Sequence, residues 1–459
     1  MSEPKELQNA IVRLGATLAD FRTRPFANNV WEKAKACLLD ALGLSLIARE
    51  EATTRAICSL SEASAPREGG VLIWPCGRKG SLSEAVTANA VSVHAHFHDD
   101  SDPHSWCHPG SLISPVAVGA AESMRGSIEL ALRGLVAGYS ILNWMGDHEC
   151  VAHALIKRGV RTSPTLGTIG AAAAASVTLG LDETQATNAL AIAASITGGT
   201  LAPLRCGSDE WRVQNAHAAR GGLLAAQLAK SGVNGAQTAL DGAKGLLQTY
   251  AGLEEIPSGW NKSLQEDAIL RIYAKPWATL GDNMAPVRAA KLLHDDGLDI
   301  EQIERIELTL WRAYAEYPGT QYKGPFDLPV QALASTSFAV AAMLTLGDLE
   351  YDVSLERRND PRLLKLVNKI TIIPSDEGTK LDSTVTVHLR NGTRRVRRAD
   401  EAPKNWLYHD AQTAIDIFEK RLSRIGRPPG TGRLIGTSLF DASGCRRPLT
   451  SLLEQVCHT

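Results

Sequence analysis

The sequence has few aromatic residues and almost no net charge. Phe, Trp and Tyr make up 5% of its 459 residues, whereas hydrophobic residues as a whole make up 44%. A β-sandwich core draws on aromatic and β-branched side chains, so this alanine- and glycine-rich composition favours closely packed helices. The 48 basic and 50 acidic residues leave a net charge of -2. This near-neutrality argues against nucleic-acid binding, which needs a basic face.

Several common functional motifs are missing. The eight cysteines include no Cys-x-x-Cys pair, which removes support for a zinc ribbon, an iron–sulfur cluster or a thioredoxin-like site. Scattered thiols are typical of a reduced, cytosolic protein. The sequence also lacks the G-x-G-x-x-G, P-loop, G-x-S-x-G and H-E-x-x-H motifs. With these motifs absent, the sequence favours acid–base chemistry on an anionic substrate that arginine side chains bind.

Long hydrophobic runs are absent as well. The longest, residues 168–181, is shorter than the roughly 20 residues that a membrane-spanning helix needs. The first 21 residues combine charges with a helical repeat and have no apolar core of a signal peptide. We therefore expect a cytoplasmic protein with no membrane partner.

Helical periodicity dominates residues 1–260. Leu7, Ile11, Leu14 and Leu18 form one hydrophobic stripe. Gly180 is predicted to end one helix, and Asp182 to begin the next as its N-cap residue. Further helices are predicted over residues 29–48, 83–96, 114–124, 128–142, 167–179, 182–194 and 215–231.

The pattern changes near residue 266. Residues 303–311 and 368–373 alternate in polarity, and residues 383–390 and 393–398 flank Asn391-Gly392, a strong hairpin signal. The arginines of residues 394–398 are interpreted as a solvated edge strand. Residues 406–425 are predicted to return to the first region as a helix. We thus expect a mainly α protein, with an all-helical domain of residues 1–264 and 404–459 and an α+β domain of residues 265–403.

The densest group of reactive side chains lies in residues 94–110, HAHFHDDSDPHSWCHPG, with five of the twelve histidines. Three interpretations are open. Histidines and aspartates can converge on a divalent metal ion. They can also form a general acid–base site, because the histidine pKa lies near neutrality and carboxylates tune it. The third interpretation is a polar loop whose histidines cap helices.

Two other segments carry candidate residues. Residues 205–220, RCGSDEWRVQNAHAAR, place three arginines around a helix start, which suits carboxylate binding but also an ordinary surface ion-pair network. Lys275-Pro276-Trp277 precedes Asp282-Asn283 at the start of the small domain. A lone lysine is usually solvated, so this segment is the weakest of the three candidates.

Several segments, taken in order, resemble the MmgE/PrpD family, which includes 2-methylcitrate dehydratase, cis-aconitate decarboxylase and iminodisuccinate epimerase. They are residues 32–48, 85–122 with its HPG, 161–195, 274–290 with its Lys-Pro, the Gln331-Ala332 and Ser335 pattern, and the hairpin at Asn391. The resemblance implies a large helical domain with a smaller α+β lid, a homodimer, and an active site in the cleft between the domains. It also implies catalysis without a nucleotide or redox cofactor, through proton movement next to a carboxylate.

The chain departs from the family pattern at several site positions. The family's D-F-D-D-T stands here as Phe97-His98-Asp99-Asp100-Ser101, so that Phe97 replaces the first Asp unless a local shift brings in His98. Four other replacements are Arg161 for a His, Trp211 for a Lys, Asp282-Asn283 for a His-containing stretch, and Phe338 for a Tyr. These changes favour a substrate other than 2-methylcitrate or a reaction with fewer acid–base groups.

The leading hypothesis is a lyase of the dehydratase or decarboxylase class that acts on a small di- or tricarboxylate. The expected catalytic residues are His108, Lys275, Asp99, Asp100 and His98. The expected substrate-binding residues are Ser101, Arg161, Arg212, Asp282 and Asn283, with no metal ligand. The alternatives are an epimerase of the iminodisuccinate type, a catalytically degenerate binding or scaffold protein, and a metal-dependent enzyme that uses the histidine cluster.

Overall fold

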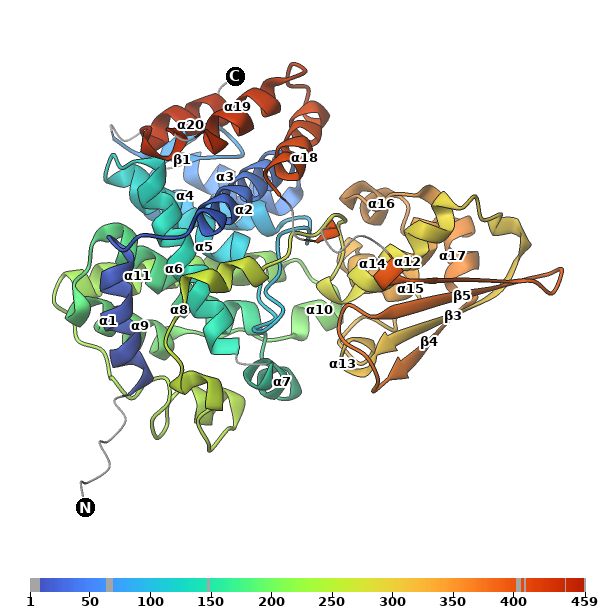
Figure 1. Ribbon diagram of the computed structural model, residues 1–459, viewed down its shortest axis with the longest axis horizontal. Coiled ribbons are helices and arrows are strands. Elements are labelled where there is room, and N and C mark those ends of the chain that lie inside the picture. The colour runs from blue at the N-terminus through green and yellow to red at the C-terminus, as the bar shows by residue number, and fades with distance from the viewer. Residues whose placement is uncertain are drawn as a thin grey trace.

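The computed structural model describes residues 9–62, 69–146, 149–401, 406–407, 410–441 and 443–457. Figure 1 shows a helical body, which contains the first and the last described helices, beside a smaller region of helices and strands that we call the lid. The protein is therefore mainly α with a smaller α+β region, as predicted. Each region has its own large hydrophobic core, one formed by residues between 10 and 272 and between 415 and 456, the other by residues between 273 and 407. No helix in the described ranges is long and apolar enough to cross a membrane.

The body is built around one completely buried helix. Every residue of α8 (Thr162–Leu179) is buried, and α5, α6, α9 and α11 surround it. Small residues allow this packing, because a Cβ added to Gly222 of α11 would lie 2.4 Å from the carbonyl oxygen of Thr168. The helices of the body are α1 (Ala10–Phe21), α2 (Asn28–Ile47), α3 (Ala52–Glu62), α4 (Leu82–His94), α5 (Pro109–Ser123), α6 (Ile128–Gly146), α7 (Cys150–Lys157), α8, α9 (Glu183–Ile196), α10 (Ala202–Cys206), α11 (Glu210–Lys230), α18 (Ala411–Arg424), α19 (Thr431–Phe440) and α20 (Leu449–Cys457).

Three predicted helices begin about one turn earlier than their hydrophobic periodicity indicated. The starts are Pro109 for α5, Thr162 for α8 and Glu210 for α11. The first turns of α5 and α8 are buried on all sides, so no exposed polar face alternates with a buried apolar face to mark a helical repeat. The predicted boundary at residues 180–182 is confirmed. Gly180 ends α8 at φ 69°, and the Asp182 side chain accepts a hydrogen bond from the Gln185 backbone N–H.

The body is not purely helical, which corrects the prediction for residues 1–264. Strands β1 (Val71–Ile73) and β2 (Arg78–Gly80) form a short antiparallel pair. Buried side chains of the neighbouring helices accept the outward backbone N–H groups of this segment. The Glu122 carboxylate accepts from Leu72 at 3.0 Å, and the Asn89 amide oxygen accepts from Trp74 at 2.8 Å. These bonds replace the missing sheet neighbours.

The lid contains a four-stranded sheet in the order β4-β3-β5-β6, with strands β3 (Ile303–Trp311), β4 (Ile370–Ser375), β5 (Ser383–Leu389) and β6 (Arg394–Arg398). Helices α12 (Met284–Asp295), α15 (Thr336–Leu346) and α17 (Pro361–Val367) lie along one side of it (Figure 1). Shorter helices are α13 (Arg312–Ala315), α14 (Pro329–Ala334) and α16 (Tyr351–Glu356). The predicted hairpin is confirmed, with Gly392 at φ 82° between the antiparallel strands β5 and β6.

The last helices return from the lid to the body. Helix α18 packs on α2, as Figure 1 shows. Arg421 of α18 donates a 2.7 Å hydrogen bond to the carboxylate of Asp40 on α2, and their side chains are only 5% and 10% exposed. A buried ion pair of this kind requires both partners, because either charge alone would be left in a poorly solvating interior.

Candidate active site

The loop between α4 and α5 is buried although it has no regular structure. Nearly all of residues 95–108 are buried, and two bulky residues, Phe97 and Trp106, have positive φ values of 54° and 55°. Such values are unfavourable for large side chains and persist only where surrounding contacts enforce them. Lys275 provides one such contact, because its ammonium group donates hydrogen bonds to the carbonyl oxygens of Phe97 and Thr279. The lid therefore holds the loop in its strained conformation.

His108 ends this loop as the residue before α5. Its Nδ1 lies 3.1 Å from the carbonyl oxygen of Asp100 and 3.3 Å from the hydroxyl of Ser101. A carbonyl only accepts, so Nδ1 carries the proton and Nε2 keeps a free lone pair. The Asp100 carboxylate also accepts from the backbone N–H of Gly110 at 2.6 Å. Asp100 thus fixes both sides of the His-Pro-Gly turn.

A second histidine, which was not among the expected site residues, supports the first. His94 Nδ1 lies 2.8 Å from the Asp99 carboxylate, and Arg161 donates to His94 Nε2 at 2.8 Å. The arginine contact makes Nε2 an acceptor, so Nδ1 donates to Asp99. Asp99 in turn lies 3.8 Å from Nδ1 of His108. The only sequence signal for His94 was its place at the start of the histidine-rich segment.

A small cavity lies where this loop meets the lid. It has a volume of about 30 Å³ and is lined by Ser101, Asp102, Pro103, Trp106, His108, Tyr273, Leu280, Gly281, Asp282, Tyr314 and Tyr317. Backbone hydrogen bonds in both directions between Ser101 and Tyr273 join its two walls. We call it the inner cavity. Its tyrosines also went unpredicted, because they are scattered over the lid sequence and only folding brings them together.

The inner cavity contains a base and an acid in unusual protonation states. Burial and the nearby Lys275 cation hold the pKa of His108 well below its usual range. Burial raises the pKa of Asp282 to about 8, and its buried Oδ2 has no hydrogen-bond partner in the described structure. At neutral pH, therefore, His108 is an unprotonated imidazole and Asp282 is a neutral carboxylic acid. Two groups whose environments push their pKa values apart are the arrangement that acid–base catalysis requires.

The expected cationic residues do not line the inner cavity, because their donors are used elsewhere. Arg161 donates to the Trp211 carbonyl, to Gln214 and to His94. Arg212 donates to the Ala95 carbonyl, Asp209 and Tyr351. Lys275 is buried, and burial lowers its pKa to about 8 while its ammonium group binds two carbonyl oxygens.

Two further expected residues lie away from the inner cavity. The amide of Asn283 donates to the Thr279 hydroxyl and accepts from the Thr336 hydroxyl, so it ties together elements of the lid. His98 is buried with no partner for its Nδ1 in the described residues. Burial lowers its pKa to about 4, and the nearby Arg421 cation contributes to the same shift. His98 therefore belongs to the junction between α18 and the loop.

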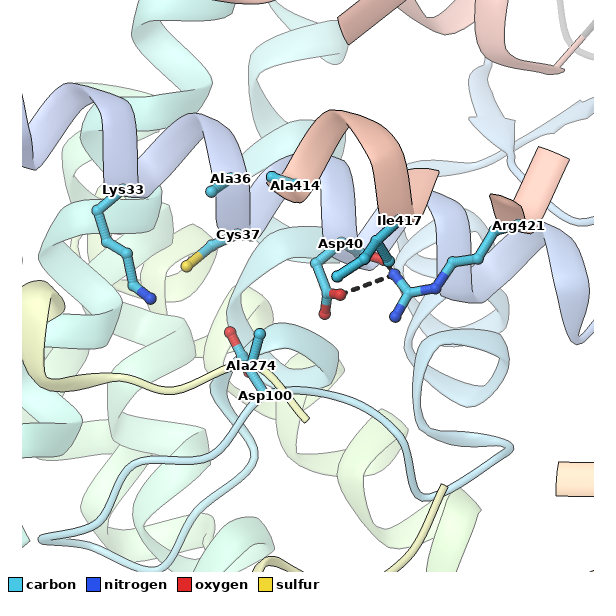
Figure 2. A pocket seen from close by; sticks show the side chains of 9 residues that line it. All are labelled: Lys33, Ala36, Cys37, Asp40, Asp100, Ala274, Ala414, Ile417 and Arg421. Carbon is cyan, nitrogen blue, oxygen red and sulfur yellow. Dashed lines mark hydrogen bonds and ion pairs between the residues drawn. The ribbon is translucent and has the colours of Figure 1, made fainter. Parts of the chain in front are cut away.

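Asp100 faces a second, smaller cavity at that junction. This cavity measures about 10 Å³ and lies between Asp100, α2 and α18, with Lys33, Asp40 and Arg421 among its lining residues. Figure 2 shows Asp100 below α2 and the Asp40–Arg421 ion pair beside it. Burial and the Asp40 charge raise the pKa of Asp100 to about 7, although Tyr139 donates to its carboxylate at 2.7 Å.

A larger groove opens on the other side of Tyr317. It has a volume of about 490 Å³ and runs between α10 of the body and the lid segment 315–322. We call it the outer groove. Its cation is Arg205, which is exposed, and Glu316 on the same groove pairs with Arg312 at 3.4 Å. Tyr317 lines both spaces, so the outer groove and the inner cavity are neighbours at this side chain.

Two of the replaced family positions lie together. Phe97 and Trp211, which stand where the family pattern has Asp and Lys, have ring centroids 4.7 Å apart and are both buried. Two apolar rings thus fill the space, so neither replacement leaves an unpaired buried charge. Within the described ranges, no group of three His, Cys, Asp or Glu side chains is arranged to hold a metal ion.

Comparison with known proteins adds independent findings. The sequence model of the MmgE/PrpD N-terminal domain matches residues 12–258, and that of the MmgE/PrpD C-terminal domain matches residues 284–420. A cis-aconitate decarboxylase of Mus musculus is 25% identical over 398 residues, 83% of this chain and 79% of that protein. The Homo sapiens cis-aconitate decarboxylase is 28% identical over 341 residues, 70% of this chain and 68% of that protein. A cis-aconitate decarboxylase-like protein of Aspergillus oryzae is 25% identical over 399 residues, 81% of each chain.

Proposed function

The chain belongs to the MmgE/PrpD family, and from this premise we propose that it is a lyase of the dehydratase or decarboxylase class acting on a small di- or tricarboxylate. Relatives named as cis-aconitate decarboxylases support the class of reaction. The observation that carries the proposal is the pairing of a neutral His108 with a neutral, protonated Asp282 at one cavity.

The proposed chemistry begins at His108. Its Nε2 lone pair takes a proton from the carbon next to a substrate carboxylate, and the C–H electron pair moves into an enolate-like system. In a dehydration, Asp282 gives its proton to the leaving hydroxyl, which departs as water. In a decarboxylation, the electrons come from the breaking C–CO₂ bond instead, and the acid protonates the carbon. Tyrosine hydroxyls of the inner cavity donate hydrogen bonds to the developing negative charge.

The surrounding residues act on His108 rather than on the substrate. Asp99, oriented by His94, places a negative charge beside His108 and stabilises the imidazolium that forms when the base takes a proton. Asp100 and Ser101 hold the ring in the tautomer that leaves Nε2 unprotonated. Lys275 fixes the loop and lowers the pKa of His108 through its charge.

Carboxylate binding is assigned to Arg205. Arg161 and Arg212 donate to groups of the protein itself, whereas Arg205 is exposed on the groove that adjoins the inner cavity. A carboxylate bound there by the guanidinium leaves the reacting end of the substrate directed toward Tyr317 and the inner cavity. The inner cavity is small, at about 30 Å³, so the proposal includes an outward movement of the lid when a di- or tricarboxylate enters.

Turnover tests on the purified full chain examine this proposal. Proton NMR follows a panel that contains cis-aconitate, 2-methylcitrate and other small di- and tricarboxylates. With the substrate that turns over, His108→Gln and Asp282→Asn should each lower kcat by about 10²–10⁴-fold. The control Asp267→Asn, at an exposed position, should not change it. Full activity in both site variants would contradict the assignment. Binding without turnover across the panel would favour a degenerate binding protein.

An epimerase of the iminodisuccinate type is the second candidate. The favouring observation is that the base and the acid come from different regions, His108 from the body and Asp282 from the lid, because epimerisation needs a base and an acid on opposite faces of one carbon. Proton NMR in D₂O separates the reactions. An epimerase exchanges the α proton for deuterium without forming an alkene or CO₂, whereas a lyase forms one of these products.

A further inference from the structure

Two cysteines meet on the side of the body where α3 packs against the β1–β2 hairpin. Cys58 lies on α3 and is buried, and Cys76 lies in the turn between the strands and is half-buried. Both belong to a small hydrophobic cluster with Val71 and Ile73, and their thiols influence each other's ionisation. The Cys76 sulfur lies 3.7 Å from the carbonyl oxygen of Ile73. Neither residue takes part in the candidate active site.

One arginine binds both cysteines. Arg78, on β2, donates from Nε to the Cys76 sulfur at 3.5 Å and from Nη2 to the backbone carbonyl of Cys58 at 3.0 Å. The guanidinium therefore holds the turn against α3 and places a positive charge beside the Cys76 sulfur. A cation next to a thiol favours the thiolate, which is the nucleophilic form.

The two thiols have different ionisation properties. Interaction with the Cys58 thiol lowers the pKa of Cys76 to about 7, despite partial burial. The same interaction and burial raise the pKa of Cys58. A half-exposed thiolate beside a buried protonated thiol is the arrangement of an attacking and a resolving cysteine. By contrast, burial raises the pKa of Cys107 to about 12, and that of Cys37 still further.

We propose that Cys58 and Cys76 form a reversible redox pair that is oxidised by small disulfides of the glutathione type. The Cys76 thiolate attacks one sulfur of the oxidant, and the first glutathione thiolate leaves as the S–S bond breaks. Cys58 then loses its proton and attacks the Cys76 sulfur of the mixed disulfide, which expels the second glutathione thiolate. Two protein thiols become one disulfide, and one glutathione disulfide becomes two thiols.

The disulfide would connect α3 to the β1–β2 hairpin. The hairpin is attached to α4 and α5 through Asn89 and Glu122, so the covalent link would join three helices of the body. The link would also close a loop between residues 58 and 76, which restricts the unfolded chain and should raise the melting temperature of the oxidised protein.

Mass spectrometry of the full chain tests the proposal. The protein is equilibrated with mixtures of reduced and oxidised glutathione, quenched with acid, alkylated and digested. We expect a peptide that links Cys58 to Cys76, and we expect dithiothreitol to reverse it. Cys58→Ser should instead retain glutathione on Cys76, whereas Cys76→Ser should prevent modification of Cys58. Cys206→Ser, a change at an exposed cysteine outside the pair, should leave the linked peptide unchanged.

A rate measurement tests the role of the arginine. Iodoacetamide reacts with the thiolate, so Cys76 should be alkylated at pH 7 severalfold faster than Cys206, and Arg78→Met should remove most of that advantage. Circular dichroism of Arg78→Met checks that the variant is folded, and Arg78→Lys should retain part of the rate. If Cys76 stays reduced, stays glutathionylated without reaction at Cys58, or is alkylated no faster than Cys206, the proposal is wrong.

Discussion

Replacing Asp282 with asparagine should make the protein more stable, and increasingly so as the pH rises. The folded-state pKa of Asp282 is raised by burial to about 8, against about 3.8 for an exposed aspartate. At pH values between these two pKa values, the unfolded chain has released a proton that the folded protein retains. The free energy of unfolding of the wild type therefore falls by about 1.4 kcal/mol for each pH unit. Asparagine mimics the protonated acid and does not ionise. The variant's advantage should therefore grow from pH 4 to about pH 8 and then level off.

The magnitude of this effect has an upper limit of about 6 kcal/mol, which applies if the cavity does not relax around the ionised group. The assay is urea denaturation of wild type and Asp282→Asn at pH 5, 6, 7 and 8, followed by fluorescence. The measured quantity is the difference in midpoint between the two proteins at each pH. Asp267→Asn provides the matched control, because that aspartate is exposed. Parallel midpoints for wild type and Asp282→Asn over this range would refute a protonated Asp282 and remove the proposed acid.

Three other predictions concern the same loop and its supports. Initial rates should fall above about pH 8, as the proposed acid ionises, and on the acid side should fall only well below pH 6.5, because burial and the Lys275 cation lower the pKa of the proposed base. A profile that stays flat from pH 5 to 9 would contradict this pair. Gly110→Ala places a Cβ 2.9 Å from the Asp100 carboxylate. It should lower the free energy of unfolding in urea by about 1–3 kcal/mol and should also lower the activity. A Gly110→Ala variant as stable as the wild type would show that the turn accommodates the added methyl group. Arg421→Met leaves the Asp40 carboxylate buried without its partner and should lower the free energy of unfolding by about 3–5 kcal/mol. Adding Asp40→Asn should restore part of that loss in thermal denaturation, and an unchanged double variant would argue against the ion pair.

Much of the fold could be predicted because its signals are local. Helix α9 begins at its capping aspartate and α8 ends at Gly180, since a side-chain cap and a left-handed glycine act within a few residues. The β5–β6 hairpin follows from Asn391-Gly392 for the same reason. The first turns of α5 and α8 were missed because burial on every side removes the contrast between an exposed polar face and a buried apolar face on which periodicity depends. The β1–β2 pair was missed because each strand has only three residues and because the side chains that accept its outward N–H groups, Asn89 and Glu122, lie outside the hairpin on other elements.

The candidate site divides in the same way. The histidine-rich loop was visible as a cluster in the sequence, and His108 and Asp99 do lie close together. That Asp282 and His108 line the same cavity depends on the lid packing against the loop, and nothing in the local sequence encodes that packing. The same holds for Arg161 and Arg212, whose positive charges suggested carboxylate binding but whose donors are occupied by carbonyl oxygens and side chains of the folded chain.

The sequence by itself determined the class of architecture, most helix ends, the hairpin of the lid and the presence of a reactive loop, because these depend on composition and on interactions between near neighbours. Only the tertiary structure decided which titratable groups share a cavity and which protonation states they hold. The physical reason is that burial, and the long-range contacts that come with it, sets the pKa of each group. His108 is made a base and Asp282 an acid by the same loss of water, which disfavours the charged form of both.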